Sequence, residues 1–200
     1  MGKRIVVGGL VGGVVVFLVS FLWHSLPLGE IGVQKLPAEE AVLAALRASI
    51  HDPGFYIFPV PSMTENRSAE QKKADQAAYL ERFRQGPTGI LVYKSGGEGM
   101  NFGKLLGTQF LLGLAAALVA AWMLAMLAIT AGATAYGTRA GLVLAAALFG
   151  GIVYDLPAWL WYGFPASYTA GHIAGWLVSW GAAGLAMAAI VKRPAAPAAG

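Results

Sequence analysis

The chain has 200 residues, of which 57% are hydrophobic and 12% are charged. Soluble domains carry about 25% charged residues, so this composition excludes an ordinary soluble protein. Because the chain lacks cysteine, disulfides, Cys-ligated zinc, iron–sulfur clusters and Cys-attached haem are excluded as well.

The first predicted element is a transmembrane helix within residues 1–27. Residues 5–23 carry no charge, and a bilayer core is crossed by about 20 helical residues. A cleaved signal peptide is the alternative, because Lys3 and Arg4 precede the apolar run. The run exceeds the roughly 7–15 residues of a signal core, and no A-x-A-like site follows. We therefore expect an anchored helix.

Residues 28–104 form the predicted extracytoplasmic domain, with mixed α/β structure. Helical spacing and Pro/Gly punctuation predict a helix over 38–51, a strand over 54–58, a helix over 69–85 and a strand over 89–94. A two-stranded sheet in so short a segment makes a marginal core. We expect this domain to rest on the membrane or on a partner.

Residues 105–191 are predicted to form transmembrane helices 2 to 4. Residues 105–138 and 173–191 are uncharged, and residues 140–164 carry one charge, Asp155. Backbone groups in lipid must bond internally, so these runs are expected to be helical. Residues 192–200 form a predicted disordered cytoplasmic tail. The predicted fold is thus a mainly α membrane protein with four transmembrane helices and the inserted α/β domain.

Charge predicts the orientation. The predicted extracytoplasmic domain balances nine basic against nine acidic residues, whereas the rest of the chain is basic. The basic residues outside that domain are Lys3, Arg4, Arg139, Lys192 and Arg193. With four spans all five lie on one side, which is the cytoplasm by the positive-inside rule. We predict a bacterial inner-membrane protein with both termini cytoplasmic and no nucleic-acid partner.

Small residues recur at four-residue spacing on the predicted transmembrane helices. In lipid such residues let helices approach closely. They predict a tight bundle, or docking against another membrane protein or a second copy of the chain. The predicted packing positions are Gly8, Gly12, Gly113, Ala117, Ala121, Gly171 and Gly175.

Asp155 is the most informative polar residue. It lies about 22 Å above the cytoplasmic start of the third helix, at 1.5 Å per residue. A carboxylate at that depth usually faces the bundle interior or a partner. His172 and His24 are predicted on the same outer side, with Tyr154, Tyr162 or Tyr168 as hydrogen-bond partners. These residues predict either a ligand or proton site or a structural contact that pins the turn between helices 3 and 4.

A metal on Asp155 and the two histidines, and a haem between His24 and His172, are chemically conceivable. We favour neither, because the sequence separations are uninformative and the histidines are expected near the surface. No cofactor is predicted.

Three phrases resemble uncharacterised bacterial inner-membrane proteins of this size: residues 53–59, 86–93 and 161–165. The resemblance covers most of the chain and implies no activity. H-E-x-x-H, G-x-S-x-G and Walker patterns are absent from the sequence. We therefore expect a non-catalytic accessory or scaffold subunit. A small-ligand or proton-handling protein that uses Asp155 and His172 is the first alternative, and a membrane enzyme is the second.

Overall fold

The structure is a computed structural model that describes residues 1–61, 67–96, 99–131 and 135–192. It is mostly helical, at 75%, with one small two-stranded sheet. The chain divides into two compact units, one of Met1–Val33 with Met100–Gly200 and one of Gln34–Gly99. The predicted disordered tail beyond Lys192 lies outside the described residues.

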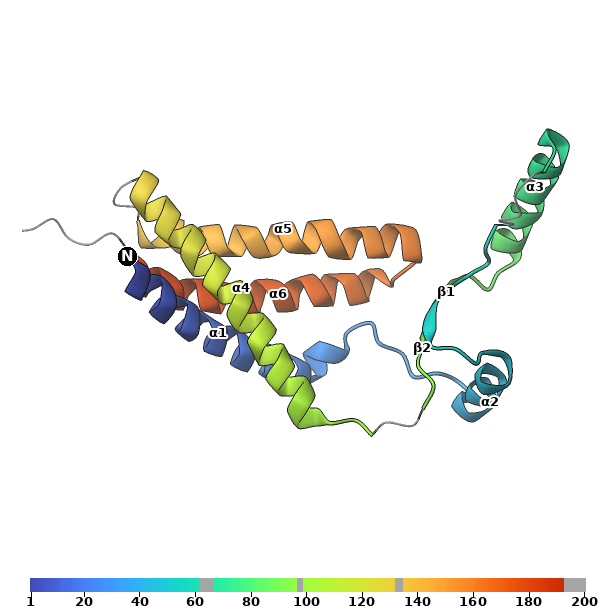
Figure 1. Cartoon of the computed structure of the whole chain (residues 1–200), viewed down its shortest axis with the longest axis horizontal. Coiled ribbons are helices and arrows are strands. Elements are labelled where there is room, and N and C mark those ends of the chain that lie inside the picture. The colour runs from blue at the N-terminus through green and yellow to red at the C-terminus, as the bar shows by residue number, and fades with distance from the viewer. Residues whose placement is uncertain (62–66, 97–98, 132–134, 193–200) are drawn as a thin grey trace, which may run out of the picture. The chain divides into compact units, whose positions relative to one another are not determined.

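Four long helices build the first unit (Figure 1). They are α1 (Gly2–Ser25), α4 (Phe102–Thr130), α5 (Tyr136–Tyr162) and α6 (Ala166–Ile190). Each is long and apolar enough to cross a membrane. The prediction of four such helices is confirmed.

Local chemistry explains where these helices begin and end. The side chain of Asn101 caps α4 by accepting a hydrogen bond from the backbone N–H of Lys104 at 2.9 Å. Gly163 ends α5 in the left-handed region, at φ 70°, where a residue without Cβ is not strained. Pro165 follows and precedes the first turn of α6.

The helices pack unevenly around α1. Extensive contacts join α1 to α4 and to α6, and α5 to α6, whereas α4 meets α5 and α6 sparsely. Figure 1 shows α4 crossing the other helices obliquely, so that its N-terminal half diverges from α5. The bundle is therefore not closed along the α4–α5 side.

Two rows of glycine on α1 receive two different helices. A Cβ added to Gly12 would lie 2.6 Å from Met187 Sδ on α6, and one added to Gly13 would lie 3.0 Å from Leu114 Cα on α4. The row toward α6 contains Gly8 and Gly12, and the row toward α4 contains Gly9 and Gly13. These close approaches are possible only because glycine lacks a side chain.

The other predicted packing positions also lie in interfaces. The ring of Trp23 packs against Gly175, and the side chain of Ile31 packs against Gly171. Gly113 lies against Val16. Ala117 and Ala121 are fully buried on α4. Small side chains thus line the contacts of α1 with α4 and the contacts of α6 with the N-terminal segment.

Polar side chains donate to carbonyls at and around the C-terminal end of α6. Arg139 is 7% exposed, and its Nε and Nη2 both donate to the Ala188 carbonyl, at 3.1 and 2.9 Å. The Tyr136 hydroxyl donates to the Leu185 carbonyl at 2.9 Å, and Arg4 donates to the Lys192 carbonyl. The carbonyls at a helix C-terminus lack intrahelical donors and attract positive charge. Arg139 therefore holds α5 to the C-terminal end of α6.

The segment after α1 belongs to the first unit up to Val33. A 3-10 turn, η1 (Pro27–Glu30), packs on α1 and α6. Ile31 then lies against Gly171, and Gly32 approaches Tyr168 with φ 78°. The predicted inserted domain starts at residue 28, whereas the second compact unit starts at Gln34.

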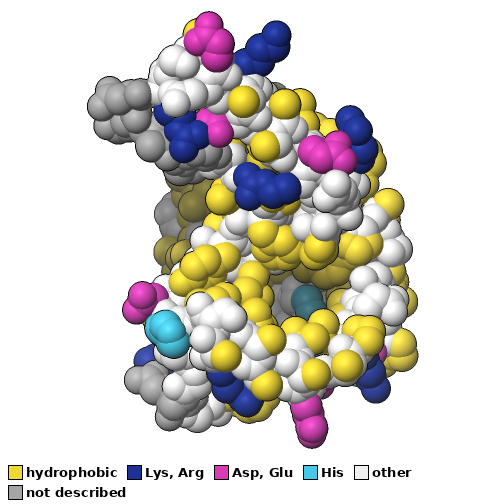
Figure 2. All heavy atoms as spheres, turned by 90° about the vertical axis from the view of Figure 1, so that its right-hand side faces the viewer, with side chains coloured by type: hydrophobic (Ala, Val, Ile, Leu, Met, Phe, Trp, Pro, Cys, Tyr) yellow, Lys and Arg dark blue, Asp and Glu magenta, His cyan; other side chains and the backbone are white. Residues whose placement is uncertain are grey.

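The second unit contains α2 (Glu39–Ser49), β1 (Gly54–Phe58), α3 (Ala69–Gln85) and β2 (Gly89–Tyr93). The two strands are antiparallel, with Gly54 opposite Tyr93 and Phe58 opposite Gly89. No residue of α2 or α3 is buried. Figure 2 shows hydrophobic side chains at the surface over much of the displayed face.

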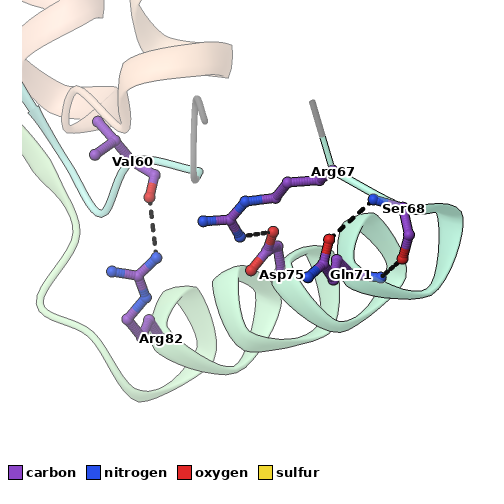
Figure 3. A network of polar contacts seen from close by, with 6 residues as sticks. All are labelled: Val60, Arg67, Ser68, Gln71, Asp75 and Arg82. Carbon is purple, nitrogen blue, oxygen red and sulfur yellow. Dashed lines mark hydrogen bonds and ion pairs between the residues drawn. The ribbon is translucent and has the colours of Figure 1, made fainter. Parts of the chain in front are cut away.

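Polar contacts hold the start of α3 and link its end to the loop after β1 (Figure 3). Ser68 and Gln71 form a reciprocal capping box, which satisfies two backbone N–H groups. Arg67 forms an ion pair with Asp75. Arg82 donates to the Val60 carbonyl at 3.0 Å. The described part of α3 is thus organised by hydrogen bonds rather than by an apolar core.

Candidate functional site

Asp155 lies near the C-terminal end of α5 and is 6% exposed. Its helix is apolar, and Pro157 follows within the same turn. Proline lacks the N–H that would bond the carbonyl four residues earlier, so the backbone is less saturated here than elsewhere in α5. The sequence therefore places one carboxylate in an apolar helix, next to a position where Pro157 removes one backbone hydrogen bond of that helix.

His172 meets this carboxylate from α6. The distance from His172 Nδ1 to Asp155 Oδ1 is 2.6 Å, a short hydrogen bond between side chains. Hydrogen bonds to an ionised group in a low-dielectric site are stronger than neutral ones. The pair joins α5 to α6 and fixes Nδ1 as the ring nitrogen that faces the carboxylate.

Two aromatic neighbours on α6 orient the imidazole. Tyr168 stacks on the His172 ring, with centroids 5.9 Å apart and an angle of 8° between planes. Trp176 meets the same ring edge-on, with centroids also 5.9 Å apart and an angle of 89°. Because these residues are spaced by four, they share one face of the helix. The imidazole is therefore sandwiched along its own helix.

The Trp176 indole N–H also lies 3.3 Å from His172 Nδ1. One ring nitrogen has one in-plane position, for either a proton or a lone pair. The Asp155 contact at 2.6 Å is much shorter and takes that position. The indole N–H is then available to another acceptor.

The second carboxylate oxygen of Asp155 is buried and has no hydrogen-bond partner among the described residues. It lies beside Gly151, where an added Cβ would come within 3.7 Å of it. An ionised carboxylate offers about four acceptor positions, and leaving a buried polar group unpaired costs about 1–3 kcal/mol. Asp155 is thus only half satisfied by the described part of the chain.

Thr169 is a polar neighbour that the sequence analysis missed. It is buried, and its Oγ1 has no partner among the described residues either. Thr169 precedes His172 by three positions, so both lie on one face of α6. That spacing was visible in the sequence, but a threonine hydroxyl usually bonds its own helix backbone and gave no reason to single it out.

Two cavities border His172, and the first of them also borders Asp155. The first, of about 830 Å³, lies between α4, α5 and α6. Its wall includes Val119, Met123, Tyr154, Asp155, His172 and Trp180. The second, of about 660 Å³, lies between α1, α4 and α6. Its polar wall residues include Ser20, His24, Gln109, His172 and Ser179.

One ridge of side chains belongs to both cavities. His172, Trp176 and Trp180 recur every four residues along α6, and Ala116 faces them from α4. His172 thus touches a mostly apolar cavity on one side and a more polar cavity on the other. His172 therefore borders two chemically different spaces, whereas Asp155 borders only the larger cavity.

The predicted site residues divide between these spaces. Asp155 and His172 are bonded to each other, and Tyr168 stacks on His172. His24 lines the α1 cavity, and its Nδ1 lies 2.8 Å from the Ser20 carbonyl. Tyr162 is exposed at the end of α5 and lines neither cavity.

The described residues contain no group of three His, Cys, Asp or Glu side chains arranged to hold a metal ion. His24 and His172, which were considered above for a metal or a haem, both line the α1 cavity, and His172 is the one that is hydrogen-bonded to Asp155.

Comparison of the chain with protein-family models, with curated proteins and with solved structures found no match. The resemblance of three sequence phrases to bacterial inner-membrane proteins therefore stays an expectation.

Proposed function

We propose that this chain is an integral membrane protein that binds a small ligand at the Asp155–His172 pair. The half-satisfied carboxylate of Asp155 carries the proposal. An ionisable group buried among transmembrane helices is costly and is generally kept for function. The adjoining cavity of about 830 Å³ is within the size range of small-molecule sites, about 300–1,000 Å³.

The surroundings favour binding over catalysis. Apart from the pair, Tyr154 is the one titratable residue in the wall of the larger cavity, and most other wall residues are alanine, valine, methionine or tryptophan. Such a wall offers apolar contacts and few groups for proton transfer or nucleophilic attack. A polar group that fixes orientation within an apolar pocket is the usual composition of a binding site.

The proposed location is the bacterial inner membrane, with both termini cytoplasmic and the second unit outside. The excess of basic residues at the α1 start, the α4–α5 connection and the chain end supports this orientation. In that arrangement the pair lies in the outer part of the bilayer, because Asp155 is near the end of α5 and His172 is near the start of α6.

The test is mass spectrometry of small molecules that copurify with the full chain in mild detergent. We expect a compound retained by the wild type and lost from Asp155→Asn. Trp161→Phe is the matched control, since Trp161 is an exposed aromatic residue near the same end of α5 and lines neither cavity. A compound retained equally by Asp155→Asn, or no compound in any sample, would contradict the proposal.

A second candidate function is that of an accessory subunit, favoured by one face of the β-ribbon. Phe55 and Val92 are opposite each other in the register, and Ile57 lies two residues along the same face. Their exposed fractions are 56%, 65% and 47%. Contiguous exposed apolar side chains mark interaction surfaces, so a protein partner is proposed to cover this face.

This second candidate is tested by identifying proteins that copurify with the wild type and with the Phe55→Ser/Val92→Ser double variant. We expect one protein to be lost from the double variant. Lys73→Ser/Lys72→Ser on exposed α3 positions is the control. If both double variants retain the same proteins, the ribbon face is not the contact.

A further inference from the structure

We propose that the ligand is a lipophilic organic cation, and that it exchanges with a proton held by the Asp155–His172 pair. This inference rests on the proposed binding function and adds the ligand class. It starts from the charge that the pair can carry in its apolar surroundings.

The hydrogen bond between His172 Nδ1 and Asp155 Oδ1 fits two charge states. With a neutral imidazole, Nδ1–H donates to the carboxylate and the pair carries one negative charge. With an imidazolium, Nδ1–H donates in the same way, Nε2 carries the extra proton, and the pair is neutral. The same geometry therefore serves the pair with or without one additional proton.

A net negative charge in an apolar cavity is costly unless a positive charge accompanies it. Either the extra proton on His172 or a bound cation supplies that charge. Both together would leave the site with a net positive charge in the same low dielectric. Proton and cation are thus alternatives, and the exchange balances: a cation binds, the imidazolium releases one proton from Nε2, and the site stays neutral.

The wall of the larger cavity suits a lipophilic cation. Trp176, Trp180 and Tyr154 present aromatic rings, whose faces attract positive charge. Val119 and Met123 add an apolar surface on α4. The carboxylate of Asp155 also has an oxygen without a partner among the described residues. Such a wall offers too few polar groups to replace the water that a hydrophilic cation loses on entering the cavity.

The cation and the proton are proposed to use different cavities to reach or leave the pair. The larger cavity lies between α4, α5 and α6, and α4 meets α5 sparsely, so the apolar ligand is proposed to enter from the lipid between α4 and α5. His172 also lines the α1 cavity, whose polar wall residues include Ser20 and Gln109. These polar groups provide positions for water and a route by which the released proton leaves.

Among the described residues, the other titratable groups on the two cavity walls or in ring contact with His172 come from three helices. They are His24 on α1, Tyr154 on α5 and Tyr168 on α6. The residues of α4 that line the two cavities carry no titratable side chain. His24 is the group that could imitate the proposed pH response, so its removal is a necessary control.

The experiment measures binding of tetraphenylphosphonium to the purified full chain in mild detergent, by equilibrium dialysis between pH 6 and pH 8. If one proton is exchanged, the affinity for the cation should rise as pH increases. The rise should be up to about tenfold per pH unit in the range where the pair holds the proton. Calorimetry in two buffers of different ionisation enthalpy should then count up to one proton released per cation. We expect Asp155→Asn to abolish binding, and Trp161→Phe and His24→Gln to retain it.

A neutral aromatic probe, N-phenyl-1-naphthylamine, separates this inference from the proposed function. If the neutral probe binds in an Asp155-dependent manner and the cation does not, the ligand class is wrong and the binding function stands. If neither probe binds, both are wrong. Cation affinity that does not change with pH in the wild type overturns the exchange without relying on any variant.

Discussion

His172 Nδ1 lies 2.6 Å from Asp155 Oδ1, and this contact joins α5 to α6 near the start of α6. At the opposite end of the same helix pair, Arg139 on α5 donates two hydrogen bonds to the Ala188 carbonyl on α6. Polar clamps thus lie at the two ends of the α5–α6 interface, and between them Gly151 meets Ile173 and Gly184 meets Val143. One clamp is well satisfied, whereas the other keeps an unpaired carboxylate oxygen.

The first prediction concerns coupling between the residues of the incomplete clamp. In a double-mutant cycle of Asp155→Ala and His172→Ala, we expect a coupling energy of about 1–3 kcal/mol, because contacting residues in one hydrogen bond are not independent. The measurement is reversible unfolding in mixed micelles. Trp161→Ala combined with His172→Ala is the control and should be additive. Additive effects of the Asp155 and His172 substitutions would show that the contact does not stabilise the fold.

The second prediction concerns the other clamp. Arg139→Gln should lower the free energy of unfolding by about 1.5–3 kcal/mol, because it removes charged hydrogen bonds and leaves the Ala188 carbonyl without these donors. Lys192→Gln removes an exposed charge at the same end and should change stability little. Equal effects of the two substitutions would mean that charge near the membrane surface, rather than the buried clamp, is what matters.

The third prediction compares glycines of α1. Gly13→Ala should destabilise the bundle by about 1–3 kcal/mol, the usual cost of overpacking, because its Cβ would meet the Leu114 backbone. Gly12→Ala should cost less, because its Cβ would meet the flexible end of Met187.

The control for this series is Gly107→Ala on α4, where an added Cβ meets nothing within 4 Å. Unfolding in mixed micelles again provides the measurement. If the Gly12, Gly13 and Gly107 variants unfold alike, the two glycine rows do not set the distances between α1 and its neighbours.

The fourth prediction tests the orientation, using the absence of cysteine from the natural chain. In intact cells a membrane-impermeant maleimide should label Ala77→Cys on the exposed face of α3, but neither Lys3→Cys nor Lys192→Cys. After permeabilisation all three should react. Labelling of either terminal position in intact cells, or protection of Ala77→Cys, would reverse or break the proposed topology.

The sequence was sufficient for features that depend on local chemistry and on the solvent. Long uncharged runs predicted four apolar helices, because only helices satisfy the backbone of a single span in lipid. Pro and Gly boundaries around short apolar runs indicated the strands, and β1 (Gly54–Phe58) and β2 (Gly89–Tyr93) pair as one small sheet. Asp155 stood out because a charge in such a run is rare.

What the sequence could not supply was the rotation of each helix about its axis and the pairing of helices. Nothing local showed that His172 rather than His24 bonds Asp155, or that Thr169 is buried on α6. In the sequence, Arg139 was only one of the basic residues that indicate the cytoplasmic side. In the structure its buried side chain donates two hydrogen bonds to the Ala188 carbonyl. Only packing in three dimensions decides which face of a helix is covered, because each apolar helix offers several faces of similar composition.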